Sequence, residues 1–431
     1  MPHYSFYLCI TRDSCYLFIK TRREHLIASA PQRDPAVPEY KPQIDGARFL
    51  AVFVVLIYHF FSSLQGPNKI FDLTTFIAFF FALSGYLITK ILLVAKEIGL
   101  KKDRKRVTIA FVFLIRRTLR IFPAYYLYLL IIMLLPVGGY YLRNNAGMFF
   151  GYLSNFQIYK DQLWERFATP HLWTLAVEEQ FYLIWPWLIL FIPTRQLPKL
   201  FIFLIAAGIA FRLTYYALLG NVTQNVPFTV LTPACLDSFG LGGLLAYQHL
   251  YVRNRNPWIM RACAMILPLW IIMAYFGSSI WTVGFQRVFV SVFSLWGIEA
   301  ANTGLKNLFG RFLQSKVVVY LGKISYGIYL YHLFAAFFFW RVFEKVSEFA
   351  SGKGVSLAPL GNFLAKPFVN FIFYFITTVT LATLSWYLLE QPFNNLKRFI
   401  RIGRPKAKDA LQKIPLEKEQ LDQKLHDRKT G

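Results

Sequence analysis

The stretch FLAVFVVLIYHFF, residues 49–61, runs for thirteen residues without a formal charge. Comparable runs occupy residues 125–135 and 201–211. A helix on the surface of a soluble protein carries its apolar residues as a spaced stripe, whereas a helix that crosses a membrane is apolar over most of its length. These runs therefore predict an all-α protein, built as a polytopic bundle of membrane helices.

The composition agrees with a membrane protein. Of the 431 residues, 56% are hydrophobic and 16% are charged, whereas about a quarter of a soluble domain is charged. The formal net charge of +25 comes mostly from basic residues between the apolar runs and in the last part of the chain. Cytoplasmic loops beside anionic lipid have this distribution, so we expect membrane lipid as a partner and no nucleic acid.

Apolar runs of about 20 residues, separated by basic loops, predict about ten membrane helices. The expected spans are residues 45–64, 74–94, a third that follows Arg116–Arg120 and ends near Pro136, and then 172–193, 200–219, 232–250, 262–277, 284–301, 317–343 and 366–390. The segment 147–159 is apolar but short, and it decides on which side the later loops lie. If it lies at the outer face without crossing, every basic loop is cytoplasmic. We therefore expect a multi-pass inner-membrane protein with both termini in the cytoplasm.

The chain divides by composition into three parts. Residues 1–39 lack the uninterrupted apolar core of a signal peptide and are expected to form a cytoplasmic extension. Residues 40–399 form the predicted membrane domain, and residues 400–431 are expected to form a basic cytoplasmic tail. The four cysteines show neither metal-ligand spacing nor a disulfide framework, so the sequence predicts no metal site. They are Cys9, Cys15, Cys235 and Cys263.

Ionisable side chains inside membrane spans are costly and mark candidate functional sites. In IDGARFLAVFVVLIYHF, Arg48 and His59 are eleven residues apart, which places them on one helix face roughly 16 Å from each other. We expect Asp45 to cap this helix, Arg48 to lie at its cytosolic mouth, and His59 to lie deeper as a candidate base. The structural alternative is an arginine that reaches the membrane surface and a histidine bonded to a neighbouring helix.

Three arginines open the third span in RRTLRIFPAYY: Arg116, Arg117 and Arg120. Residues three or four apart present their side chains together on a helix, and guanidinium groups match the geometry of phosphate oxygens. These arginines are candidate ligands for the phosphates of a coenzyme. Anchoring of the helix at the cytoplasmic surface explains the same residues equally well.

Two adjacent carboxylates stand near the head of an apolar helix in HLWTLAVEEQFYLIWP. Glu178 lies one turn from both Thr174 and Tyr182, which gives it hydroxyl neighbours on its own face. We interpret Glu178 as a catalytic candidate and expect Glu179 at the surface.

A polar stripe follows one face of the apolar segment LGKISYGIYLYH, where Ser325, Tyr329 and His332 recur at helical spacing. We interpret these three as a substrate-binding site, and hydrogen bonding between helices is the alternative. Arg212 and Asp237 are two further buried charges, which we expect to pair across helices for structural reasons.

Seven motifs in this order resemble acyltransferase family 3, the membrane O-acyltransferases of bacterial glycans. They are Arg48-x10-His59, FFALSGYLIT (80–89), RRTLRIFPAYY (116–126), HLWTLAVEEQFYLIWP (171–186), LDSFGLGGLLAY (236–247), LGKISYGIYLYH (321–332) and SWYLLEQPF (385–393). The resemblance covers about residues 40–399, and it implies a bundle of about ten membrane helices in a bacterial inner membrane.

The resemblance also implies the chemistry: transfer of an acyl group, usually acetyl, from acyl-CoA to a carbohydrate hydroxyl. It implies that Arg48 and His59 are essential, with His59 as base or transient acyl carrier. It implies that Arg117 and Arg120 bind the coenzyme, and that Glu178 is the family's glutamate. Many relatives carry an additional hydrolase-like domain, which is not evident in this sequence.

Two points stay open at this stage. The acceptor is expected to be a polysaccharide, a lipid-linked glycan or a glycolipid. The alternative function is a transporter or flippase of a lipid-linked sugar, which would also place charges within the membrane. That alternative predicts repeat symmetry, and no internal repeat is evident in the sequence.

Overall fold

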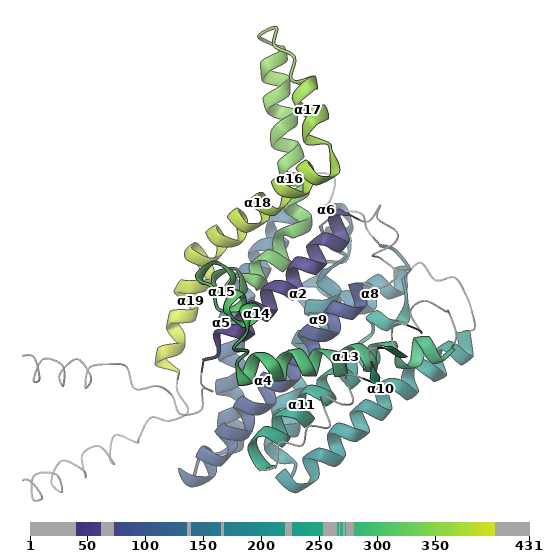
Figure 1. The fold of residues 1–431 in the computed structure, drawn as a ribbon, viewed down its shortest axis with the longest axis vertical. Coiled ribbons are helices and arrows are strands. Elements are labelled where there is room, and N and C mark those ends of the chain that lie inside the picture. The colour runs from purple at the N-terminus through teal and green to yellow at the C-terminus, as the bar shows by residue number, and fades with distance from the viewer. Residues whose placement is uncertain are drawn as a thin grey trace, which may run out of the picture.

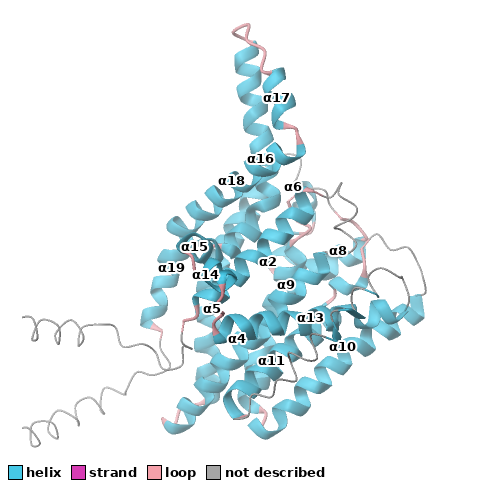
Figure 2. Ribbon diagram, in the orientation of Figure 1, coloured by secondary structure: helices cyan, strands magenta, loops and turns pink. Residues whose placement is uncertain are grey.

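The computed structural model describes residues 40–61, 73–135, 139–164, 168–219, 226–252 and 280–400, together with 265–266, 268–269 and 272. Every regular element in these ranges is helical, as Figure 2 shows, so the predicted all-α class is confirmed for them. The predictions for residues 1–39, for the tail after Ile400 and for most of the span 262–277 lie outside the described residues. The same holds for Cys9, Cys15 and Cys263.

The long helices follow the apolar runs of the sequence, and each predicted span outside 262–277 overlaps one of them. They are α2 (Pro42–Phe60), α4 (Leu73–Lys101), α5 (Arg106–Leu134), α9 (Leu172–Phe191), α10 (Leu197–Leu219), α11 (Leu236–Tyr251), α13 (Ile280–Thr303), α16 (Ser325–Ser351) and α18 (Pro367–Ser385). Short helices connect them: α6 (Gly139–Asn144), α7 (Ala146–Phe150), α8 (Ser154–Asp161), α14 (Leu308–Leu313), α15 (Lys316–Lys323), α17 (Ala358–Leu364) and α19 (Gln391–Asn395). Single turns complete the described elements: η1 (Thr194–Gln196), η2 (Phe228–Val230), η3 (Thr232–Cys235), the π-helical η4 (Trp386–Glu390) and η5 (Leu396–Phe399).

Within the described ranges, four helices are long and apolar enough to cross a membrane, and the bent pair α15–α16 makes a fifth candidate. The four cover Pro42–Phe60, Phe76–Lys101, Thr194–Leu218 and Pro367–Phe399. The predicted number of about ten spans is therefore not confirmed. Helices α5, α9, α11 and α13 do not meet the combined test of length, hydropathy and charge. Helix α11 has 16 residues and is short for a crossing, and several polar side chains of α9, α11 and α13 lie inside the bundle.

The segment 147–159 is divided between the short helices α7 and α8. A helix of eight residues is only about 12 Å long, whereas the apolar core of a bilayer is about 30 Å thick. This geometry agrees with the interpretation that the segment does not cross. The side of the membrane on which it lies stays a prediction.

The expected single span at 317–343 is wrong in one respect, because the chain bends by 73° between α15 and α16. Gly322, near the end of α15, passes so close to the backbone of Asp45 on α2 that a Cβ atom would clash with it. This close approach fixes α15 against α2. The bend then directs α16, which begins at Ser325, into the interior of the bundle.

Helices α4, α10 and α11 pack closely together, with α13 beside them. Gly242 of α11 faces the backbone of Ala82 and Tyr86 on α4, and Gly85 of α4 faces the backbone of Phe239 on α11. Small residues at such positions let two helix backbones approach, which is the main source of helix association inside a membrane. The position of α4 is therefore set by its contact with α11.

Arg212 and Asp237 form the predicted structural pair. Arg212 Nη2 of α10 donates to Asp237 Oδ2 of α11 over 2.8 Å, and both side chains are fully buried. Arg212 also donates to the carbonyl oxygens of Ala234 and Gly284, so its charge is surrounded by acceptors. The prediction of a pair across helices is confirmed.

The C-terminal part of α16 runs beyond the other helices and forms a hairpin with α17 that projects from the bundle (Figure 1). Its outer surface carries the exposed ion pairs Arg341–Glu344 and Lys345–Glu348. The N-terminal half of the same helix is buried and contacts α18, α2 and α5. One helix thus joins the interior of the bundle to its most protruding part.

Candidate active site

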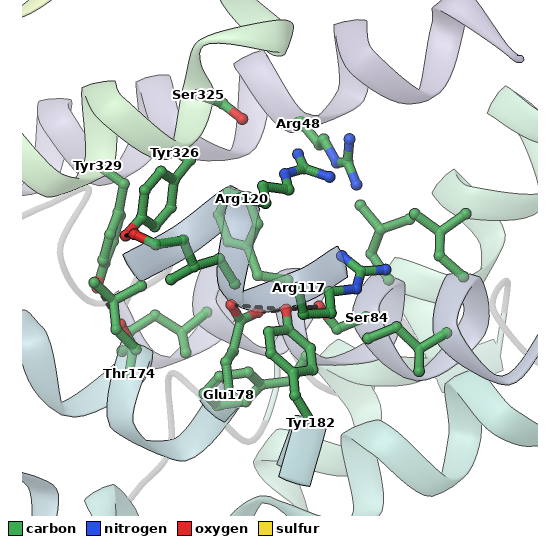
Figure 3. Close-up of a pocket in the computed structure, with 18 residues that line it drawn as sticks. Arg48, Ser84, Arg117, Arg120, Thr174, Glu178, Tyr182, Ser325, Tyr326 and Tyr329 are labelled. Carbon is green, nitrogen blue, oxygen red and sulfur yellow. Dashed lines mark hydrogen bonds between the residues drawn. The ribbon is translucent and has the colours of Figure 1, made fainter. Parts of the chain in front are cut away.

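A small cavity of about 110 Å³ lies where α2, α4, α5, α9 and α16 meet, and we call it the arginine cavity. Its polar lining residues come from all five helices (Figure 3). They are Arg48, Ser84, Arg117, Arg120, Thr174, Glu178, Tyr182, Ser325, Tyr326 and Tyr329. The structure therefore brings together six of the residues that the sequence singled out: Arg48, Arg117, Arg120, Glu178, Ser325 and Tyr329.

Glu178 is held by two hydroxyl groups. Ser84 Oγ of α4 donates to Glu178 Oε1 over 3.0 Å, and the Tyr182 hydroxyl donates to Oε2 over 3.2 Å. The two hydroxyl oxygens are themselves 3.2 Å apart. Tyr182 follows Glu178 by one helical turn, as the spacing predicted. Ser84, which lies in FFALSGYLIT, fixes the carboxylate from a second helix.

The cavity carries more positive than negative charge. Arg48 forms an ion pair with Asp45 over 3.2 Å, but neither Arg117 nor Arg120 has an ion-pair partner in the described part of the chain. In Figure 3 the guanidinium groups of Arg48 and Arg120 point into the same part of the cavity. Like charges held together are unfavourable unless an anion joins them. The arrangement suits an anionic ligand.

Aromatic rings support Arg117. Its guanidinium group lies 5.4 Å from the ring centres of both Phe113 and Tyr182. Such stacking favours a planar guanidinium group and fixes its orientation. Arg117 is thereby held beside the carboxylate of Glu178.

Two expectations about carboxylates are wrong. Asp45 does not cap α2, because the helix begins at Pro42 and Lys41 is the capping residue; the aspartate instead lies in the first turn, where it can reach Arg48. Glu179 is not a surface carboxylate. It is half-buried, and its Oε1 is enclosed without a hydrogen-bond partner among the described residues.

Arg116 lies apart from this group. Its Nη1 donates to the carbonyl oxygen of Ile400 over 3.1 Å, and it does not line the arginine cavity. Adjacent helix positions are about 100° apart, so Arg116 and Arg117 face different directions. A role for Arg116 in coenzyme binding stays a prediction.

A second, larger cavity of about 420 Å³ adjoins the first, and we call it the aromatic cavity. Its lining is rich in rings: Tyr58, His59, Trp164, His171, Trp173 and Tyr329, with Pro170, Pro227, Ile77, Thr229 and Val230 between them. Ile77 and Tyr329 line both cavities and so form a shared wall. Arg48 and His59, on one helix, thus line two different cavities.

Three imidazole rings lie together beside this cavity, and we call His59, His171 and His332 the histidine cluster. The ring centre of His332 is 4.9 Å from that of His59 and 4.9 Å from that of His171. His332 is completely buried and lines neither cavity, although the sequence predicted that it contacts substrate. That role stays a prediction, and the structure gives His332 a direct neighbour in His59.

Tyr329 connects the two cavities through hydrogen bonds. Its hydroxyl group lies 2.7 Å from Thr174 Oγ1 and donates to the carbonyl oxygen of His171 over 3.2 Å. Thr174 also donates to that carbonyl oxygen over 2.9 Å. The shared wall is therefore fixed to the start of α9, which carries both His171 and Glu178.

His171 is the site residue that sequence reasoning missed. It opens the motif HLWTLAVEEQFYLIWP and precedes Glu178 by seven residues, or about two helical turns. That spacing places the two residues on one face and is a signal that could have identified His171. Among the described residues, no group of three or more His, Cys, Asp and Glu side chains has the geometry to hold a metal ion.

Comparison with known proteins finds related sequences. The family model of the acyltransferase domain matches residues 41–387. A peptidoglycan O-acetyltransferase OatA of Listeria monocytogenes is 30% identical over 318 residues, which cover 68% of this chain and 49% of that protein. An O-acetyltransferase OatA of Staphylococcus aureus is 29% identical over 324 residues, covering 68% and 50%. The chain thus spans about half the length of these curated relatives, and no solved structure matches it.

Proposed function

Because this chain belongs to the acyltransferase domain family, we propose that it is a membrane O-acyltransferase, which transfers an acetyl group from acetyl-CoA to a carbohydrate hydroxyl. One observation carries the proposal: an arginine-lined cavity and an aromatic cavity with a histidine share a wall. A reaction between an anionic donor and a sugar acceptor needs two such compartments in contact. The names of the relatives favour a peptidoglycan-type glycan as the acceptor, and other cell-surface polysaccharides and glycolipids offer the same hydroxyl chemistry.

The arginine cavity is the proposed donor site. Coenzyme A carries phosphates, and guanidinium groups bind phosphate oxygens through paired, charge-assisted hydrogen bonds. The volume of about 110 Å³ is too small for a nucleotide but suits the narrow acyl end of the donor. The proposal therefore places the thioester inside, with Arg117 and Arg120 toward the phosphates, and the cytosol as the side from which the donor enters.

The aromatic cavity is the proposed acceptor site. Tyr58, Trp164 and Trp173 offer flat apolar surfaces to the C–H faces of a sugar ring, while Thr229 offers a hydroxyl group. Aromatic residues of this kind combine a large contact area with a polar edge. The cavity is large enough for a sugar ring and keeps that ring beside His59.

The transfer balances within these two cavities. His59 removes the proton from the acceptor hydroxyl, whose oxygen attacks the thioester carbonyl carbon. The new C–O bond forms as the C–S bond breaks, and the proton passes from His59 to the departing sulfur of the coenzyme. Glu178, fixed by Ser84 and Tyr182, and the guanidinium groups of Arg48 and Arg117 supply the charges that orient the donor.

A transporter or flippase of a lipid-linked sugar is the competing function. It would use the aromatic cavity but leave the small arginine cavity without a role. The family assignment also argues against it. The two functions differ in whether a thioester bond is broken.

The test uses purified full-length protein with acetyl-CoA and a soluble peptidoglycan fragment. We expect release of free coenzyme A and addition of one acetyl group to the glycan by mass. His59→Ala should slow transfer by about 10²–10⁴-fold, the usual contribution of a general base. His249→Ala is the matched control, because His249 pairs with Glu299 over 2.5 Å and lines neither cavity. Transfer that persists in His59→Ala would remove His59 from the mechanism.

A further inference from the structure

The hydrogen positions of two histidines are set by the backbone. His332 Nδ1 lies 2.6 Å from the carbonyl oxygen of Tyr329, and His171 Nε2 lies 3.0 Å from that of Leu330. A carbonyl oxygen only accepts hydrogen bonds, so each of these nitrogens carries a hydrogen. In a neutral imidazole the other nitrogen is then a bare acceptor. His332 Nε2 and His171 Nδ1 therefore each carry a lone pair and no hydrogen.

These lone pairs are enclosed. His332 Nε2, His171 Nδ1 and His59 Nε2 are all buried, and none has a hydrogen-bond partner among the residues that the structure describes. A buried acceptor without a partner is unfavourable, because it has lost its hydrogen bonds to water and gained none in the protein. Three such nitrogens on neighbouring rings are a feature that packing alone does not require. Together these nitrogens can accept hydrogen bonds from one added proton.

The surroundings of the cluster supply no competing charge within the described ranges. Its ring contacts are with Tyr58, Phe60, Tyr128 and Tyr329. Within the cluster, the ring of His332 contacts those of His59 and His171. No carboxylate in those ranges is hydrogen-bonded to any of the three imidazoles. In a serine hydrolase triad, a carboxylate orients the histidine and stabilises its protonated form. In this structure, uncharged aromatic and imidazole rings surround His59 where a triad would have its carboxylate.

We propose that His171 and His332 are positioning residues for acyl transfer, which orient His59 and accept its N–H when it is protonated. They replace the orienting carboxylate of other acyl-transfer sites with lone pairs that add no negative charge to an apolar interior. This inference rests on the proposed function, because His59 gains its proton from the acceptor hydroxyl. Since the proton returns to the sulfur of the coenzyme, the cluster ends each cycle as it began.

His332 gives the sharper test, because it lines neither cavity. In His332→Met the lone pair is lost, and we expect kcat to fall by about 10–100-fold, as for other residues that orient a reactive group. The KM values for acetyl-CoA and for the peptidoglycan fragment should not change. In His332→Gln the amide oxygen can lie near the position of Nε2 and accept a hydrogen bond in its place. The kcat of His332→Gln should therefore lie between those of His332→Met and wild type. Thermal unfolding and acetyl-CoA binding check that each variant is folded.

A second acceptor separates positioning from a structural role. Hydroxylamine attacks thioesters with little help from a base, so its enzyme-dependent reaction should be slowed much less in His332→Met than transfer to the sugar. Equal slowing with both acceptors would overturn the inference. His171→Asn, whose amide oxygen can replace Nδ1, and His171→Leu provide an independent pair if His332→Met does not fold.

Two further results would overturn the inference. Wild-type protein that reacts with neither acceptor would refute the proposed function and this inference with it, whereas active wild type and fully active His332→Met would refute only the inference. Activity that a chelator removes and zinc restores would assign the three nitrogens to a metal ion and not to a proton.

Discussion

Replacing Gly242 with alanine tests how far the packing of α4 against α11 sets the site. A methyl group there would lie 2.7 Å from the backbone nitrogen of Tyr86 and 3.0 Å from the carbonyl carbon of Ala82. Packed atoms prefer separations of about 3.5–4.0 Å, so the two helices must part by roughly 1 Å. Helix α11 has little room on its other side, where a methyl group on Gly243 would lie 2.8 Å from the ring of Phe201 on α10.

The displacement would reach Ser84, which lies between Ala82 and Tyr86 on α4 and donates to Glu178 over 3.0 Å. An added 1 Å takes this contact out of hydrogen-bond range, and a misplacement of that size can cost on the order of 10²-fold in rate. Overpacking of a well-packed interior costs about 1–3 kcal/mol of stability. We therefore expect Gly242→Ala to fold, to unfold at a lower temperature and to transfer acetyl groups about 100-fold more slowly.

The assay compares the release of coenzyme A in the presence of a glycan acceptor, and the thermal unfolding, of purified wild type and variant. Gly297→Ala on α13 is the matched control, since a methyl group at Gly297 meets nothing within 4 Å. That control should be as active as wild type and at least as stable, because alanine is the better helix former. If both glycine variants behave alike, helix spacing does not set the geometry of Glu178.

Two other predictions concern charges. Arg117→Lys should raise the KM for acetyl-CoA about tenfold, because lysine lacks the planar fork and the stacking on Phe113 and Tyr182. The control Arg116→Lys, outside the arginine cavity, should change KM little. Steady-state kinetics measure both, and equal effects would contradict the donor site. Asp237→Asn should lower the free energy of unfolding by about 3–5 kcal/mol, because it leaves the buried charge of Arg212 uncompensated. The control Glu344→Gln, in an exposed ion pair, should change this free energy little. Thermal unfolding in detergent compares the two variants, and an unchanged melting temperature for Asp237→Asn would refute the account of this pair.

The helices were predictable because apolar runs and basic loops act locally along the chain. The same is true of Glu178 and Tyr182, whose contact follows from helical spacing. Which residues line the same cavity was harder to predict, because this depends on how helices that are far apart in the sequence pack together. Arg48 and His59 lie on one helix, yet the bend before Ser325 brings Tyr329 between the cavities that they line.

The histidine cluster illustrates the same limit. The positions of His59 and His332 along their spans predicted a similar depth in the membrane, but they did not predict that the two rings touch. Their contact depends on α16 turning into the bundle after Gly322, a bend that the apolar run 317–343 conceals. The predicted number of membrane spans is not confirmed for the described residues, and the polar groups of the site do not by themselves explain this, because α2 carries Arg48 and His59 and is still long and apolar enough to cross.

The common wall of Ile77 and Tyr329 bears on how enzymes of this design can diversify. On the proposed assignment, the arginine cavity binds the donor and must stay constant as long as the same coenzyme is used. The aromatic cavity, which is the proposed acceptor site, shares only Ile77 and Tyr329 with it among the described residues. Exchanges at outlying positions such as Trp164 could therefore adapt an ancestor to a new glycan without disturbing thioester recognition.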